Sequence, residues 1–201
     1  WYTEILAPSL RNNGKFYALI YDSKTAIPYL QKLNKFYTDK LAKSPNFYNE
    51  VEVLQVDQKN PVLNVRKKVD LVLTFRNVHN WAKGGSAQTM FESFFNSLKK
   101  GGVLGVVEHR ATPGTELSQQ IKSGYMTEKY VKDLAESVGF KFVSSSDVNN
   151  NPKDKKNYPG GAKTIAKAAH LPRFISLGMS FKCFASAVIS VPPNFNPFVP
   201  S

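Results

Sequence analysis

Residues 75–82, FRNVHNWA, hold the densest group of side chains that could do chemistry. His79 titrates near neutral pH and could take a proton from an acceptor oxygen or nitrogen. Asn77 and Asn80 can both donate and accept hydrogen bonds, and the Trp81 ring can cover an apolar ligand face. A segment that only had to turn would favour Gly, Pro, Asp or Ser, so these residues predict a ligand site. Structural alternatives stay open: Asn as a turn former, Trp81 as core, and His79 as a supporting hydrogen bonder.

Further polar side chains stand at the ends of other apolar runs. Asp22 ends KFYALIYD, Asp57 ends NEVEVLQVD, and Glu108, His109 and Arg110 follow VLGVV. A guanidinium such as that of Arg110 could hold an acidic acceptor. The alternatives are turn or helix-capping aspartates and a structural salt bridge between Glu108 and Arg110.

Strands that alternate with helices position these residues. The sequence predicts strands at 15–22, 49–57, 66–75, 103–109 and 141–148, and helices at 1–10, 28–44, 86–100 and 127–140, the last with Thr127 as its N-cap. Continuous apolar strands in this arrangement indicate an α/β fold with a mostly parallel sheet and helices on both faces. The carboxyl ends of parallel strands share one edge, where ligands bind, so four polar segments should converge there.

The chain divides by composition near residue 150. Residues 1–150 are expected to form the α/β core. Residues 151–201 begin as a polar loop, NPKDKKNYPGG, and continue into a segment in which FASAVISV, 184–191, could form a strand.

The net charge is +12, from 27 Lys and Arg against 15 Asp and Glu. This balance could attract nucleic acid, anionic lipid or acidic substrates, or only solubilise the surface. The sequence lacks an RNP, zinc-finger or helix-turn-helix signature, which argues against specific nucleic-acid binding. No apolar run reaches the ~18 residues of a membrane span. The single cysteine, Cys183, excludes an internal disulfide and leaves the compartment open, and nothing indicates the oligomeric state.

Five segments carry a family resemblance: WYTEILAP, VDLVLTFRNVHNW, LKKGGVLGVVEHR, SGYMTEKYVKDLAESVGF and NPKDKKNYP. Together they resemble class I S-adenosylmethionine-dependent methyltransferases, and in particular a bacterial subgroup of predicted methyltransferases. The resemblance covers residues 1 to about 160. It implies a Rossmann-like sheet, S-adenosylmethionine as cofactor, and a small-molecule methyl acceptor.

The resemblance also implies roles for individual residues. Asp22 would bind the ribose and Asp57 the adenine amino group, with Arg76 and Asn77 also on the cofactor. His79 and Asn77 would be catalytic, although methyl transfer depends more on positioning than on a base. The acceptor side would comprise Asn80, Trp81, Glu108, Arg110 and Tyr125, the last as part of a lid.

The chain departs from the family at both ends. The family's first strand and glycine-rich turn would precede Trp1, so we expect the chain to start inside a longer product and to bind cofactor weakly. From about Ala162 the match ends. The main alternative is a non-catalytic basic binding module that keeps the fold. A nicotinamide-dependent oxidoreductase is a third hypothesis, against which the NVHNW and EHR segments argue.

Overall fold

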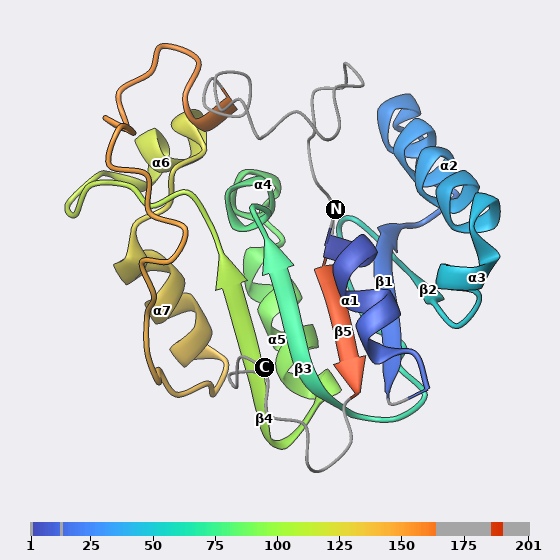
Figure 1. The fold of residues 1–201 in the computed structure, drawn as a ribbon. Helices are drawn as coiled ribbons and strands as arrows, with labels where there is room; N and C mark the ends of the chain where they lie inside the picture. Colours follow the sequence, from blue (N-terminus) through green and yellow to red (C-terminus); the bar gives the residue numbers. More distant parts are fainter. Residues whose placement is uncertain (1, 13, 164–185, 191–201) are drawn as a thin grey trace.

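The structure, a computed structural model, describes residues 2–12, 14–163 and 186–190, and it arranges five strands in one sheet (Figure 1). The strands are β1 (Lys15–Tyr21), β2 (Glu52–Val56), β3 (Val69–Phe75), β4 (Leu98–Val107) and β5 (Ser186–Ser190). The helices are α1 (Tyr2–Leu10), α2 (Pro28–Lys43), α3 (Pro45–Tyr48), α4 (Val78–Gly84), α5 (Ala87–Ser97), α6 (Leu117–Ser123) and α7 (Glu128–Ser137).

The sheet has the strand order β2-β1-β5-β3-β4. β1 is parallel to β2 and β3 is parallel to β4, whereas β5 is antiparallel to both of its neighbours, β1 and β3. β1, β2, β3 and β4 therefore all point the same way, which confirms the predicted α/β class with a mostly parallel sheet. β5 lies within the 184–191 run, and it pairs with the facing backbone groups of β1 and β3, which would otherwise form open strand edges.

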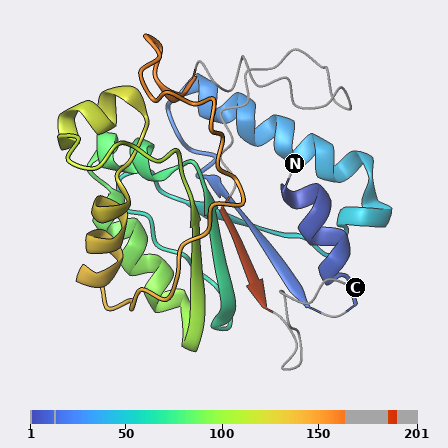
Figure 2. The same ribbon diagram turned by 60° about the vertical axis from the view of Figure 1, so that its left-hand side comes forward.

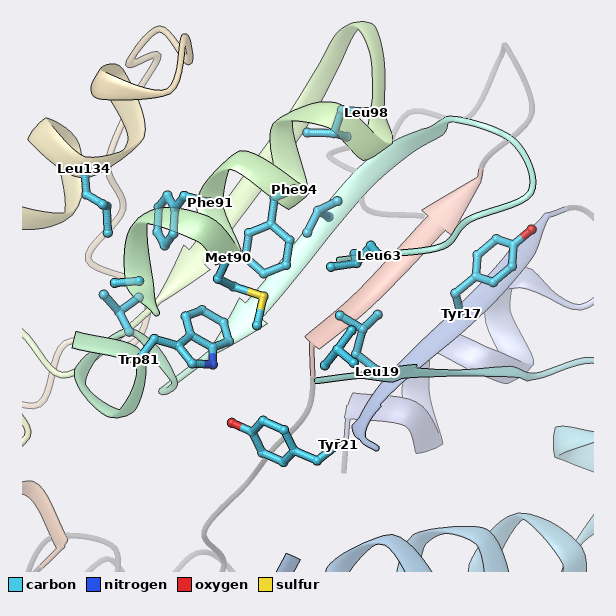
Figure 3. Packing of buried hydrophobic residues seen from close by; sticks show 14 of the residues in the cluster. Tyr17, Leu19, Tyr21, Leu63, Trp81, Met90, Phe91, Phe94, Leu98 and Leu134 are labelled. Carbon is cyan, nitrogen blue, oxygen red and sulfur yellow. The ribbon is translucent and has the colours of Figure 1, made fainter. Parts of the chain in front are cut away.

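Side chains of β1 alternate between two hydrophobic clusters, one on each face of the sheet. Tyr17, Leu19 and Tyr21 belong to the larger cluster, while Phe16 and Ala18 join the smaller one. The smaller cluster is completed by α1. The larger cluster is completed mainly by α4, α5 and α7, with a row of buried residues comprising Trp81, Met90, Phe91, Phe94 and Leu134 (Figures 2 and 3). Helices thus cover both faces, as the sequence predicts.

Thr127 caps α7 as predicted, because its hydroxyl accepts a hydrogen bond from the Tyr130 N–H at 3.2 Å. Two other expectations are wrong in detail. The helix expected at 86–100 ends at Ser97, and β4 begins at Leu98, before the two glycines. The segment after β3 is not an open loop, since its residues from Val78 onward form α4.

The strand predicted at 141–148 is absent from the structure: residues 141–147 form neither strand nor helix, and Val148 lies in a turn. Val143 and Val148 are 88% and 85% exposed, so the run buries little apolar surface. Ser146 instead makes a local contact, because its hydroxyl accepts a hydrogen bond from the Val148 N–H at 3.3 Å. Such side-chain bonds offer the backbone an alternative to a sheet ladder, and this competition explains the wrong prediction.

Candidate functional site

The polar segments predicted to converge do follow the carboxyl ends of the parallel strands. Asp22 comes directly after β1 and Asp57 directly after β2; Arg76 follows β3 and Glu108 follows β4. Because these strands are parallel to one another, the four residues share the upper edge of the sheet in Figure 1, beside α4 and α6. The topological part of the prediction is therefore confirmed.

Asp22 and Asp57 both serve as turn aspartates. The Asp22 Oδ1 accepts a hydrogen bond from the Lys24 N–H at 2.7 Å. The Asp57 Oδ1 accepts two, from the Lys59 and Asn60 N–H groups at 2.8 and 2.7 Å. These bonds hold the pKa of Asp57 below its ordinary value, the bond from Asn60 first. In both residues, one carboxylate oxygen, Oδ1, therefore has the structural role in a turn that the sequence offered as the alternative to ligand binding.

The turn between β3 and α4 has an unusual backbone. Arg76 has φ of 56°, in the left-handed region that non-glycine residues rarely adopt. Its N–H donates to the Val107 carbonyl at 2.6 Å, which ties the turn to β4. The turn carries the following residue, Asn77, into the interior, where its side chain is 1% exposed. Among the described residues, nothing hydrogen-bonds the Asn77 Oδ1. A buried amide oxygen without a partner is costly, and it is the kind of group that a ligand or water satisfies.

A small cavity lies next to the Asn77 side chain. Its volume is about 20 Å³, and its walls are formed by Leu19, Ile20, Tyr21, Val56, Asn77, Trp81 and Met90. That volume exceeds the roughly 10–15 Å³ that one water needs, but it is far below the ~300 Å³ of a small-molecule pocket. Tyr21 and Val56 are the last residues of β1 and β2 and directly precede Asp22 and Asp57, so the cavity lies at the ends of the two strands that these aspartates follow.

Trp81 is a core residue as well as a cavity wall. It is 5% exposed, and its ring meets Phe94 edge-on with centroids 5.7 Å apart (Figure 3). Its indole N–H faces Tyr21 and partly offsets the rise in the Tyr21 pKa that burial causes, but the geometry falls short of a hydrogen bond. Burial of the ring therefore favours the alternative of Trp81 as core over its predicted role in covering a ligand on the acceptor side.

His79 points away from this cavity and toward Glu108. The His79 Nδ1 lies 3.1 Å from the Glu108 Oε2, and the His79 backbone N–H lies 3.5 Å from the same oxygen. The Glu108 Oε1 accepts the His109 backbone N–H at 2.9 Å. The side chains of His79 and Glu108 are 17% and 6% exposed. Asn77 and His79 thus lie at the start of the same helix, but the Asn77 side chain lines the cavity whereas the His79 side chain contacts Glu108.

Glu108 and Arg110 do not pair with each other, contrary to one prediction. Arg110 instead contacts Asp147 at 2.8 Å and Glu128 at 3.6 Å, with 43% of its side chain exposed. Solvent-exposed pairs of this kind contribute little to stability. The Arg110 guanidinium, which was expected to bind an acidic acceptor, is thus paired with Asp147 and Glu128 of the chain itself.

Tyr125 is not a surface lid. It is 2% exposed, packs with Ala111 and Ala162, and its hydroxyl donates to the Asp154 Oδ1 at 3.0 Å. Burial and this bond both raise the pKa of Tyr125. Asn80 is exposed on α4 and does not reach the cavity.

Sequence reasoning gave no role to three residues that the structure brings to the site. Tyr21 lines the cavity. Its position one residue before Asp22 is the feature of the sequence from which this role could have been predicted. His109 stacks edge-on with Tyr125, with centroids 5.7 Å apart. Burial lowers the pKa of His109, with Arg76 and His79 adding to the effect and Glu108 and Asp154 opposing it. Asp154 lies in the polar loop and carries no local signal for this contact.

Within the described part of the chain, no group of three or more His, Cys, Asp or Glu side chains could hold a metal ion. None of the helices in residues 2–163 combines the length and apolarity needed to cross a membrane. No protein-family model and no curated protein matches this chain.

Proposed function

We propose that this chain carries the core of an S-adenosylmethionine-dependent methyltransferase that acts on a small-molecule acceptor. One observation carries the proposal: Asp22, Asp57 and Asn77 all follow the carboxyl ends of parallel strands at one edge of the sheet. Ligands of open α/β sheets bind at this edge. The resemblance to class I methyltransferases implies cofactor-binding roles for these same three residues, which supports the proposal.

The polar groups at this edge suit one part of such a cofactor. The Asn77 Oδ1 can accept a hydrogen bond from an amino or hydroxyl group, and the cavity beside it admits one small group. A nucleoside is far larger than about 20 Å³, so the rest of a cofactor would lie over the strand ends near Asp22 and Asp57. When bound, the cofactor supplies an electrophilic methyl group, while the chain's own residues bind and orient it.

The size of the cavity is the observation that favours the second candidate, a basic binding module without catalysis. A module of this kind would use the net charge of +12 and would not need the Asn77 oxygen. If the charge only solubilises the surface, any binding to nucleic acid should be weak and should fall steeply with salt, because counterion release would drive it. Salt-resistant and sequence-selective binding in a gel-shift series would favour this candidate over the methyltransferase.

An amide NMR titration tests the first proposal and can detect weak binding. S-adenosylmethionine should shift the backbone resonances of residues 22–24, 57–60 and 76–79. The Asn77→Ala variant should lose these shifts. Asn96→Ala is the matched control, because Asn96 is exposed on α5 and lies outside the cavity. An absence of shifts at millimolar cofactor, or shifts confined to other surfaces, would overturn the proposal.

A further inference from the structure

Glu108 is a buried carboxylate with both oxygens engaged by named donors. The His109 N–H holds Oε1 at 2.9 Å, and the His79 Nδ1 lies 3.1 Å from Oε2. The backbone N–H of His79 approaches Oε2 as well, at 3.5 Å. With 6% of its side chain exposed, Glu108 has little contact with water. Its carboxylate is therefore fixed between β4 and the first turn of α4.

This arrangement decides which nitrogen of a neutral His79 carries the proton. An ionised carboxylate can only accept hydrogen bonds, so the ring nitrogen facing it, Nδ1, must be the donor. The other nitrogen, Nε2, is then left with a free lone pair. Glu108 thus plays the orienting part that a carboxylate plays beside a catalytic histidine.

The far side of the His79 ring faces small residues. A Cβ built on Gly124 would lie 3.8 Å from the His79 Nε2 and 3.6 Å from both the His79 Cδ2 and the Ala162 Cβ. Gly124 has φ of 77°, a conformation that suits glycine, so the absence of a side chain beside the ring is built into the turn after α6. Among the described residues, no hydrogen bond occupies Nε2.

We propose that Glu108 is a positioning residue that holds His79 as a general base, and that the acceptor presents a hydroxyl group to Nε2. This inference rests on the proposed methyltransferase function and names its acceptor class. In the proton transfer, the acceptor O–H bond breaks, its electron pair stays on oxygen, and the proton bonds to Nε2. The resulting imidazolium lies beside the Glu108 carboxylate, which stabilises its charge. The basic net charge of the chain disfavours a cationic amine as acceptor.

The first experiment reads the tautomer directly from the ring-nitrogen chemical shifts of ¹⁵N-histidine-labelled protein. The chain has three histidines, so comparison with His79→Gln assigns the signal. Neutral His79 should be protonated on Nδ1. A wild-type His79 ring protonated on Nε2 would overturn the inference.

The second experiment uses Glu108→Gln. Its single amide oxygen can satisfy the His109 N–H, which leaves its NH₂ group to donate to the His79 Nδ1. The His79 proton should then move to Nε2, and carbethoxylation of His79 by diethylpyrocarbonate should be lost, because this reagent needs an unprotonated ring nitrogen that it can reach. Glu128→Gln is the matched control: it removes a carboxylate that pairs with Lys132 and Arg110, and His79 should be unaffected. An unchanged tautomer and unchanged reactivity in Glu108→Gln would overturn the inference.

These readouts separate the inference from the proposed function. Failure of S-adenosylmethionine to shift the cofactor-edge amides would count against the methyltransferase, whatever the His79 tautomer. Conversely, a reversed tautomer beside intact cofactor shifts would refute the base alone. Where methyl transfer is observed, an O-methyl product supports the acceptor class, and an S-methyl product contradicts it.

Discussion

Replacing Trp81 by alanine should destabilise the fold strongly. The ring is 5% exposed and lies between the β1 face and Phe94 (Figure 3). A buried aromatic side chain removes ~150–250 Å² from water, which at ~25 cal/mol per Å² amounts to roughly 4–6 kcal/mol as an upper estimate. Core Trp-to-Ala substitutions cost about 3–5 kcal/mol, in agreement with that figure. For a domain of this size, the same cost lowers the thermal midpoint by roughly 6–20 °C.

The assay is thermal unfolding followed by circular dichroism, with Phe36→Ala as the control. Phe36 is an aromatic residue on α2 that is 48% exposed, so its truncation should cost much less. Trp81→Phe keeps most of the packing and removes the indole N–H, so it should retain a near-native midpoint and allow the cavity to be probed separately. A midpoint for Trp81→Ala no lower than that of Phe36→Ala would refute the placement of Trp81 in the core.

Three further outcomes follow from the structure. Burial lowers the pKa of His109 below its ordinary value of 6.5, so the unfolded chain takes up a proton on His109 at a higher pH than the folded chain does. The free energy of unfolding should therefore fall as the pH drops below about 6.5. His109→Gln should show a smaller fall in thermal midpoint between pH 8 and 5.5 than the wild type. An equal fall in both proteins would contradict this. Thr127→Ala should cost about 1 kcal/mol in denaturant unfolding, because it removes a capping bond, whereas Asn77→Ala should lose no capping energy, because the Asn77 side chain makes no such bond. Gly161→Ala places a Cβ 2.0 Å from a backbone carbonyl of α6, so it should expose residues 151–163 to limited proteolysis. Gly114→Ala is the control, because Gly114 also has a positive φ but a Cβ there would meet no neighbouring atom. Equal proteolysis of the two variants would show that the contact between Gly161 and α6 does not hold residues 151–163 in place.

Much of the fold follows from local patterns in the sequence. The apolar runs that end at Tyr21, Val56 and Phe75 form β1, β2 and β3, because consecutive side chains of a strand must be buried on both faces of a covered sheet. Strand direction then requires that the residues after each strand share one edge. The positions of Asp22 and Asp57 at the edge of the sheet could therefore be predicted without coordinates.

The contacts within the site could not be predicted in this way, because they join residues far apart in the chain. Glu108 pairs with His79, 29 positions away, and not with its near neighbour Arg110. Glu108 and Arg110 lie past the end of β4, so strand alternation does not set the directions of their side chains. The left-handed turn at Arg76 sets the direction of the helix that follows it. The sequence by itself determined which chemical groups reach the edge of the sheet. Only the tertiary structure decided that Trp81 is buried, that the Asn77 oxygen lacks a partner among the described residues, and that His79 faces a carboxylate, because packing against distant segments sets these directions.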